Sequence, residues 1–326
     1  MKAGIVIYFS ILLVSPKIYS QVEYKKYFEN INKSRNINRD STIYYLQKAI
    51  KNVFPFNKDL LNLSYNYYET RNLKKSKNFL IKAIEKGWQF EKDNNYSNSF
   101  YIIDYDFSFI KEQKNPYNLF LNNMYKENKD KMIKSRKKFL NHLNSKENQT
   151  FEVLLQNEKY FQDLRFLFYD KKIEDSIGLK KISKYGSTPN SYLMLELLRK
   201  NQFPKRINCA RFNSQSIGLL FNHAIADFLN KEDAFEFVNL LWKLVEKGEI
   251  TPDDYALAYD HYISCFVDSQ KSFFGTTIIY TDDGKLQLME VLDPINLDKI
   301  RQEHWLIGVK EHCKSTKILL PKNYEK

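Results

Sequence analysis

A histidine and an aspartate on one predicted helix are the first residues whose types and spacing could do chemistry. Apolar residues at spacings of three and four predict a helix over 214–229, and His223 and Asp227 lie four residues apart on its flank. A carboxylate in that position can raise the pKa of an imidazole or fix its tautomer, as a general base requires. His223 is therefore the candidate catalytic centre. The alternative is a histidine at the edge of the core that is bonded only locally.

A second group of polar side chains includes residues of a predicted helix that begins near residue 251 and residues of other segments. Thr251 suits the N-cap, Pro252 suits the first turn, and Asp260 follows on the same helix as a second candidate catalytic residue. The candidate ligand-binding residues are Arg165, Asn222, His261, Gln270 and Arg301. Groups of these types can hold a carboxylate or a phosphate, but they could equally form a buried polar network. We expect Asp260 and Arg301 to come close together, on one side of the domain with His223.

The sequence predicts neither a metal site nor a cofactor. His261 and Cys265 have a spacing that could hold a metal, as do His312 and Cys313, but neither pair has enough further ligands nearby in sequence. The chain also lacks a phosphate-binding loop, a serine nucleophile elbow and a zinc-protease motif.

Composition and periodicity predict a mainly α-helical protein. Of 326 residues 43% are apolar, and only 9 glycines and 8 prolines interrupt the chain, which favours helices over glycine-rich folds. Helical spacing covers residues 151–168, 190–200, 214–229 and 232–247, and a further helix opens at 251–254. Thr276 to Tyr280 favour a strand, and Asp283-Gly284 is typical of a hairpin turn. With a last helix over 296–314, the expected carboxy-terminal domain is helical with one β-hairpin.

An internal repeat of 34 residues lies in the amino-terminal half. It pairs Thr42 with Ser76, Leu46 with Leu80, and Ala49 with Ala83. This period resembles that of tetratricopeptide repeats over about residues 40–90. Each helix pair of such a repeat leaves an apolar face that only a neighbouring pair can cover. We therefore predict tetratricopeptide-like helical repeats over 21–125, and a protein partner bound through them.

Residues 1–20 have the pattern of a signal peptide. Lys2 precedes an apolar core over 3–14, and a plausible cleavage site lies before Gln21. The apolar core is shorter than the ~18 residues that a membrane span needs. We expect an exported, periplasmic or extracellular protein with no transmembrane segment in the mature chain. The alternative is an uncleaved membrane anchor.

The three cysteines are an odd number for an exported chain. Apolar neighbours favour three buried thiols over one disulfide bridge with one free thiol. The residues concerned are Cys209, Cys265 and Cys313.

Positive charge is concentrated ahead of residue 200. The formal net charge is +12, and residues 1–200 hold 36 Lys and Arg against 21 Asp and Glu. The stretch from Lys126 to Lys138 predicts a basic helix that could meet an anionic envelope surface, the alternative being a solvated linker. Export argues against nucleic acid as the partner.

The predicted division is a signal peptide (1–20), a repeat region (21–125), a basic linker helix (126–149), a helical domain with a β-hairpin (150–316) and a tail (317–326).

Several short stretches of the carboxy-terminal half form a pattern through their order and spacing. They are Asn222-His223, residues 244–252 running into Tyr259-Asp260-His261, Gln270 with Phe274-Gly275-Thr276-Thr277, and Asp293-Pro294 running to Arg301 and Gly308. Gln162 with Arg165 and Phe203-Pro204 precede them. Together these stretches resemble the bacterial domain of unknown function 6624 family over about residues 150–316.

The chain departs from the pattern of that family at four places. The family tends to have Gln-His at Asn222-His223, Asp-Arg at Asp260-His261, Gln at Thr277 and paired Arg at Ile300-Arg301. The resemblance implies a fold rather than a reaction. The expected function is partner binding by the repeats, together with a carboxy-terminal domain that binds a ligand or is structural. The alternative is an enzyme that uses His223 as general base with Asp260 and Arg301.

Overall fold

The computed structural model describes residues 16–35, 37–88, 116–143, 145–170, 188–209 and 214–324. The protein is mainly helical with small sheets. The amino-terminal helices are α1 (Pro16–Lys33), α2 (Arg39–Ala49), α3 (Asn57–Glu69), α4 (Leu73–Glu85), α5 (Pro116–Asn141) and α6 (Ser145–Asp170). The carboxy-terminal helices are α8 (Thr188–Arg199), α9 (Ser214–Asp227), α10 (Lys231–Glu246), α11 (Pro252–Phe266), α12 (Leu297–Glu303) and α13 (Val309–Thr316).

Short strands follow α11 in two separate pairs. β1 (Lys271–Ser272) pairs in parallel with β4 (Glu290–Val291). β2 (Ile278–Tyr280) pairs antiparallel with β3 (Leu286–Leu288), and Ile279 lies opposite Gln287. Gly284 adopts a φ of 77° between β2 and β3, a conformation that glycine reaches without strain.

Side-chain caps set the start of several helices. Asn38, Asn72 and Asn230 each accept a main-chain hydrogen bond at the start of α2, α4 and α10. Thr251 and Asp254 form a reciprocal capping box at the start of α11, with Pro252 as its first residue. These local signals explain why the predicted and observed starts of α10 and α11 agree closely.

The helices of the amino-terminal half pack in sequence order, and the small residues of the 34-residue period lie in contacts between helices. Ser64 in α3 donates a hydrogen bond to the carbonyl of Ser76 in α4 at 2.9 Å, and Ser76 donates to the carbonyl of Ser64 at 2.7 Å. Ala83 in α4 is fully buried. The tetratricopeptide-like assignment stays a prediction that these contacts support.

The predicted linker helix 126–149 is instead divided between two helices. Its basic part belongs to α5, which begins at Pro116 and has non-helical angles at Asn128, and its remainder opens α6. Met132 and Phe139 of α5 are buried, and Arg136 donates a hydrogen bond to the carbonyl of Gly87 at 2.7 Å. One side of the basic stretch therefore packs against the end of α4, while its lysines Lys129, Lys131, Lys134, Lys137 and Lys138 are exposed to solvent.

The predicted single helix over 296–314 is also wrong, because the chain breaks it after α12. Trp305 adopts a φ of 59°, and its ring lies 6.0 Å from the ring of Phe28 in α1 and 5.0 Å from that of Trp242 in α10. The Nε of Arg301 donates a hydrogen bond to the carbonyl of Ile307 at 2.7 Å, which holds the break. Burial of a tryptophan between two helices outweighs the local helical preference.

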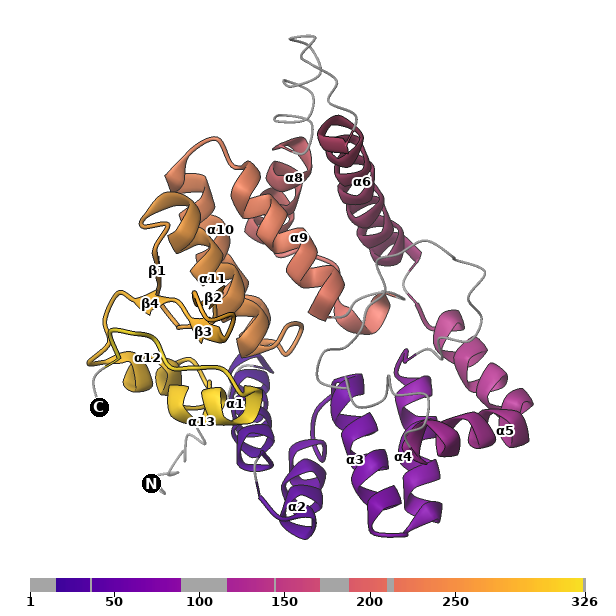
Figure 1. The fold of residues 1–326 in the computed structure, drawn as a ribbon. Coiled ribbons are helices and arrows are strands. Elements are labelled where there is room, and N and C mark those ends of the chain that lie inside the picture. The colour runs from indigo at the N-terminus through magenta and orange to yellow at the C-terminus, as the bar shows by residue number, and fades with distance from the viewer. Residues whose placement is uncertain are drawn as a thin grey trace, which may run out of the picture.

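Both halves of the chain share one core. As Figure 1 shows, the chain runs from α1 through α3, α4 and α5 to α6, and then back through α8–α11; the core includes residues of α1 and the segment that follows α12. Asn32 in α1 donates a hydrogen bond to the carbonyl of Trp305 at 2.7 Å. Arg206 donates to the carbonyls of Phe54 and Pro55 at 2.7 and 2.8 Å. The predicted ranges 21–125 and 150–316 are thus joined by a continuous set of contacts.

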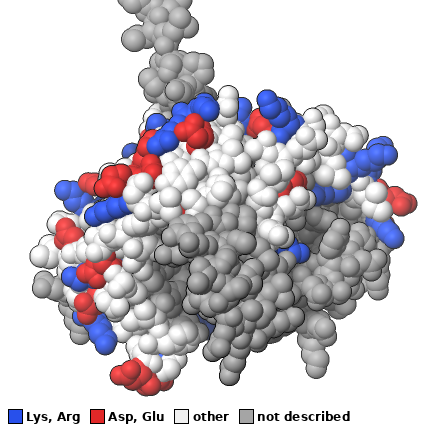
Figure 2. All heavy atoms as spheres, turned by 90° about the horizontal axis from the view of Figure 1, so that it is seen from above, with Lys and Arg blue, Asp and Glu red and all other residues white. Residues whose placement is uncertain are grey.

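The described surface carries both signs of charge. On the face shown in Figure 2, Lys and Arg side chains alternate with Asp and Glu along the described rim.

None of the described helices combines the length and the apolar character needed to cross a bilayer. Residues 1–15 of the predicted signal peptide lie outside the described residues, and α1 runs through the predicted cleavage point before Gln21.

Candidate functional site

The carboxylate of Asp260 organises the loop that follows β1. Its Oδ1 accepts hydrogen bonds from the main-chain N–H groups of Phe273 and Phe274, at 2.6 and 2.7 Å. Its Oδ2 accepts from the main-chain N–H and the hydroxyl of Thr276, both at 2.7 Å. The side chain is fully buried, and this burial raises the pKa of Asp260 while the hydrogen bonds oppose the rise. The carboxylate thus satisfies three main-chain N–H groups and one hydroxyl of the loop.

Arg301 in α12 completes the same network from the other side of the loop. Its Nη1 donates to the carbonyl of Phe274 at 2.6 Å, and its Nε bridges to Ile307. Arg301 is the largest fully buried side chain in the described part, and burial lowers its pKa against the attraction of Asp253 and Asp260. Asp260 and Arg301 therefore meet at one residue, Phe274, whose N–H donates to the carboxylate and whose carbonyl accepts from the guanidinium. They form no ion pair within 4 Å in the described part of the chain.

His223 belongs to α9, apart from the Asp260–Arg301 network, and its partner is one that the sequence did not indicate. Its Nδ1 is hydrogen-bonded to Oε1 of Glu158, which comes from α6 and is almost completely buried. The imidazole itself is 26% exposed. A buried carboxylate that holds one ring nitrogen of a partly exposed histidine is the arrangement that orients a general base.

His261, in α11, lies close enough to His223 of α9 to interact with it electrostatically. Although it follows Asp260 directly, a helix turns by about 100° per residue, so the two side chains face different neighbours. The Nε2 of His261 lies 3.6 Å from the Sγ of Cys265, one turn later. Burial lowers the pKa of His261, and the positive charge that His223 can carry lowers it further.

The remaining predicted residues are spread over the surface and the helices. Gln270 is exposed, and its main-chain N–H donates to Asp268 at 2.9 Å. The side-chain oxygen of Asn222 is buried and has no hydrogen-bond partner in the described structure. Arg165 lies in α6, at a position whose side chain is outside the described residues. The candidate residues thus divide into a buried Asp260–Arg301 network and a separate Glu158–His223–His261–Cys265 cluster.

Metal ligands do not gather anywhere among the described residues. No group of three or more His, Cys, Asp or Glu side chains there is arranged to hold an ion.

The three cysteines occupy unequal environments. Cys209 and Cys313 are buried, whereas Cys265 is exposed near the end of α11, so the expectation of three buried thiols is wrong for this residue. None of the three is in a disulfide.

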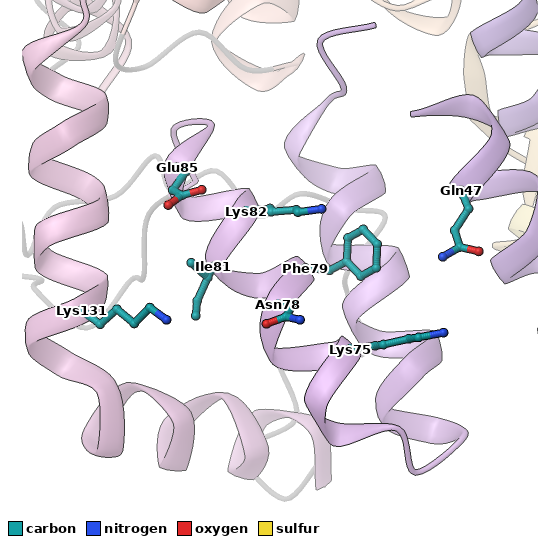
Figure 3. Close-up of a pocket in the computed structure, with 8 residues that line it drawn as sticks. All are labelled: Gln47, Lys75, Asn78, Phe79, Ile81, Lys82, Glu85 and Lys131. Carbon is teal, nitrogen blue, oxygen red and sulfur yellow. The ribbon is translucent and has the colours of Figure 1, made fainter. Parts of the chain in front are cut away.

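A groove crosses the outer face of α4 in the amino-terminal half. It has a volume of about 420 Å³ and is lined by Gln47, Lys75, Asn78, Phe79, Ile81, Lys82, Glu85 and Lys131. Figure 3 shows α2 on one side of α4 and α5 on the other. Lys75 and Lys82 point toward the α2 side, and Lys131 reaches across from α5.

Aromatic rings support the lysines of this groove. The ring of Phe79 stacks on that of Tyr67 with centroids 5.6 Å apart. The Nζ of Lys75 lies 5.1 Å from the centre of the Tyr67 ring, and that of Lys82 lies 5.0 Å from the centre of the Phe79 ring. Gln47 donates a hydrogen bond to the Tyr67 hydroxyl at 2.7 Å. Cation–π contacts of this kind hold ammonium groups over an apolar wall while leaving them accessible.

Comparisons with models of protein families, with characterised proteins and with solved structures found no match for the chain. The resemblances to tetratricopeptide repeats and to the domain of unknown function 6624 family therefore stay predictions. The arguments that follow rest on the geometry of the chain itself.

Proposed function

We propose that this is an exported partner-binding protein, and that the groove over α4 binds an acidic segment of another protein. The observation that carries the proposal is the lining of the groove. Three lysine side chains line the groove, Lys75 and Lys82 toward the α2 side of α4 and Lys131 on the α5 side, whereas Glu85 is the only acidic residue of its described lining. Positive charge over aromatic and aliphatic carbon suits a peptide that alternates carboxylates with apolar side chains.

The charge distribution along the chain supports the same partner. The excess of Lys and Arg in residues 1–200 gives the half that contains the groove a positive potential, which speeds encounter with an acidic segment. The lysines of α5 were also a candidate for contact with an anionic envelope surface. Lys131 points from α5 toward α4, which favours a ligand that crosses the outer face of α4 and meets lysines on both sides of it.

The carboxy-terminal half has a structural role in this proposal. Full burial of Asp260 and Arg301, both bonded to main-chain groups, supports a network that locks the loop after β1 between α11 and α12. Cleavage of the predicted signal before Gln21 would keep the contacts that α1 makes with this half, because Tyr24, Asn32 and Arg35 all follow that point.

A charge-reversal variant tests the groove. The double substitution Lys75→Glu and Lys82→Glu is expected to weaken binding of a fluorescein-labelled peptide rich in Asp, Glu and Leu by roughly tenfold or more, because attractive charges become repulsive. Fluorescence anisotropy would measure the dissociation constant. Binding by the unaltered protein should also weaken with added salt.

The matched control lies on the same helix. Lys74→Glu with Lys77→Glu changes the net charge by the same amount but does not touch the groove, so it should bind the peptide nearly as the unaltered protein does. Equal loss in both variants would mean that only net charge matters, and absence of peptide binding would overturn the proposal. Binding to vesicles of anionic phospholipid, without binding to the peptide, would instead identify the partner as a membrane surface.

The contact between Glu158 and His223 favours a second candidate function, a hydrolase with His223 as general base. His223→Gln is expected to abolish any hydrolysis of p-nitrophenyl esters or phosphate esters, with a fall of about 10²-fold or more, because a base is lost. Release of p-nitrophenol measures the rate, and His142→Gln, which alters an exposed histidine, is the control. Equal rates in both variants would exclude this role of His223.

A further inference from the structure

The part of α5 that follows Asn128 carries aliphatic side chains on its solvent side. Ile133 is 49% exposed and Leu140 is 44% exposed. Almost two full turns separate them, so they share one face of the helix, about 10 Å apart along its axis. Met132 and Phe139, each one position earlier, are buried. This part of α5 therefore has one apolar side packed against the protein and a second, smaller one open to solvent.

Lysines flank the two exposed aliphatic side chains. Lys129 and Lys137 lie one turn before and one turn after Ile133, at about 40° from it around the helix, and Lys134 follows it directly. All three lysines are exposed. Asp130 is the only acidic residue between positions 129 and 142, where the chain holds six Lys and Arg. We call the following residues the outer face of α5: Lys129, Ile133, Lys134, Lys137 and Leu140.

The outer face of α5 is directed away from α4. Lys131 lies about 160° around the helix from Ile133, and Figure 3 shows its side chain pointing from α5 toward α4. Arg136 joins this part of α5 to the end of α4, because it donates a hydrogen bond to the carbonyl of Gly87 at 2.7 Å. The outer face and the groove over α4 are therefore separate surfaces.

The composition of the outer face fits a lipid surface better than a folded partner. Protein interfaces are enriched in aromatic side chains and depleted in lysine, whereas this face combines two aliphatic side chains with three lysines. A helix with apolar side chains along one line and lysines beside it is typical of attachment in the plane of a bilayer surface. Lysine stems can lie along the acyl chains while their ammonium groups reach the phosphates. The excess of positive charge selects lipids with negatively charged head groups.

We propose that the outer face of α5 attaches the protein to a membrane surface that contains anionic lipid. Ile133 and Leu140 enter the boundary between the head groups and the acyl chains, and the three lysines bind head-group phosphates. Two aliphatic side chains and a few charges give a reversible attachment. Because the outer face points away from α4, this attachment does not use the groove, and it is independent of the proposed peptide binding.

Co-sedimentation with lipid vesicles tests the apolar part of the proposal. The purified protein should bind vesicles of phosphatidylcholine and phosphatidylglycerol at least about tenfold more tightly than vesicles of phosphatidylcholine alone. Ile133→Ser with Leu140→Ser should weaken binding to the anionic vesicles by about tenfold or more, because less apolar area leaves water. Leu229→Ser with Ile295→Ser, which alters two exposed aliphatic side chains of the carboxy-terminal half, is the control and should bind as the unaltered protein does.

A second pair of variants tests the lysines. Lys134→Gln with Lys137→Gln should weaken binding to the anionic vesicles by about fivefold or more and make it less sensitive to salt. Lys310→Gln with Lys314→Gln removes the same charge from exposed positions of α13 and should have a much smaller effect. All the altered side chains are exposed, and circular dichroism would check that the variants keep their helices. Equal losses in the two lysine variants would show that only net charge acts, which would overturn the proposed face.

The remaining outcomes separate lipid attachment from other uses of the same residues. Absence of vesicle binding, or unchanged binding in Ile133→Ser with Leu140→Ser, would overturn the proposal. Light scattering would detect two copies paired through this face, and a dimer that dissociates in that variant, without vesicle binding, would contradict lipid attachment. An excess of the acidic peptide should not release the protein from vesicles, and release would place the lipid contact in the groove over α4. Peptide binding is measured without lipid, so failure of one proposal leaves the other unaffected.

Discussion

Replacing Asp260 by asparagine is expected to lower the free energy of unfolding by about 3–5 kcal/mol. The carboxylate accepts four hydrogen bonds, two at each oxygen, from Phe273, Phe274 and Thr276. Asparagine offers one accepting oxygen, and its NH₂ group would face donors that then lack an acceptor. The substitution also removes the negative charge that acts on the fully buried Arg301. Unsatisfied buried donors and an uncompensated buried cation are among the costliest defects in a protein interior.

Urea unfolding followed by circular dichroism would measure this loss, with Asp282→Asn as the control. Asp282 is exposed, so its substitution should change the free energy of unfolding by less than about 0.5 kcal/mol. If Asp260→Asn were as stable as the control, the network would not be structural. A reduced stability in Asp260→Asn with an unchanged urea dependence would agree with a local defect in an otherwise intact fold.

Gly248→Ala is expected to destabilise the protein by about 2–5 kcal/mol, for two separate reasons. Gly248 follows α10 with a φ of 68°, a left-handed conformation that costs a residue with a Cβ about 1–2 kcal/mol. An added Cβ would also lie 2.0 Å from Cε1 of Tyr24 in α1. The aromatic ring is rigid, so α1 must shift away from the carboxy-terminal half or the turn must distort.

Gly284→Ala separates these two causes. Gly284 has a φ of 77° but no atom lies within 4 Å of its added Cβ, so it carries the backbone cost alone. The difference between the two variants, measured by urea unfolding, reports the clash with Tyr24. In a Tyr24→Ala background that difference should disappear. A persistent difference would show that the contact between α1 and the turn after α10 does not cause the loss.

The starts of helices and the burial of small residues were predictable from the sequence. The Thr251 cap with Pro252 and Asp254 marks the beginning of α11, and the structure contains that capping box. The 34-residue recurrence pairs Ala49 with Ala83, and both are buried. The cap is a local signal, because it joins residues three apart, and the recurrence marks the same face of two helices, on which packed positions repeat at a spacing of three to four.

The candidate site was predictable only in its parts. Asp260, Arg301, His223 and His261 were all selected from the sequence, yet the structure assigns them to two different places. Spacing did not indicate Glu158, because it meets His223 across 65 positions of chain. Nor did spacing indicate the groove over α4, whose lysines come from helices that only folding brings together.

The sequence by itself thus determined the helical class, several helix starts and the residue types available for chemistry, since hydrogen bonds and periodicity within one helix depend on neighbours along the chain. The tertiary structure alone decided which of those residues meet. Asp260 and His261 are adjacent in sequence but diverge around α11, whereas Asp260 and Arg301, far apart in sequence, meet at Phe274. It also decided that a helix predicted over 296–314 breaks, because Trp305 is buried against Phe28 and Trp242. Such contacts gain their free energy only when distant segments exclude water together, and no local pattern records that gain.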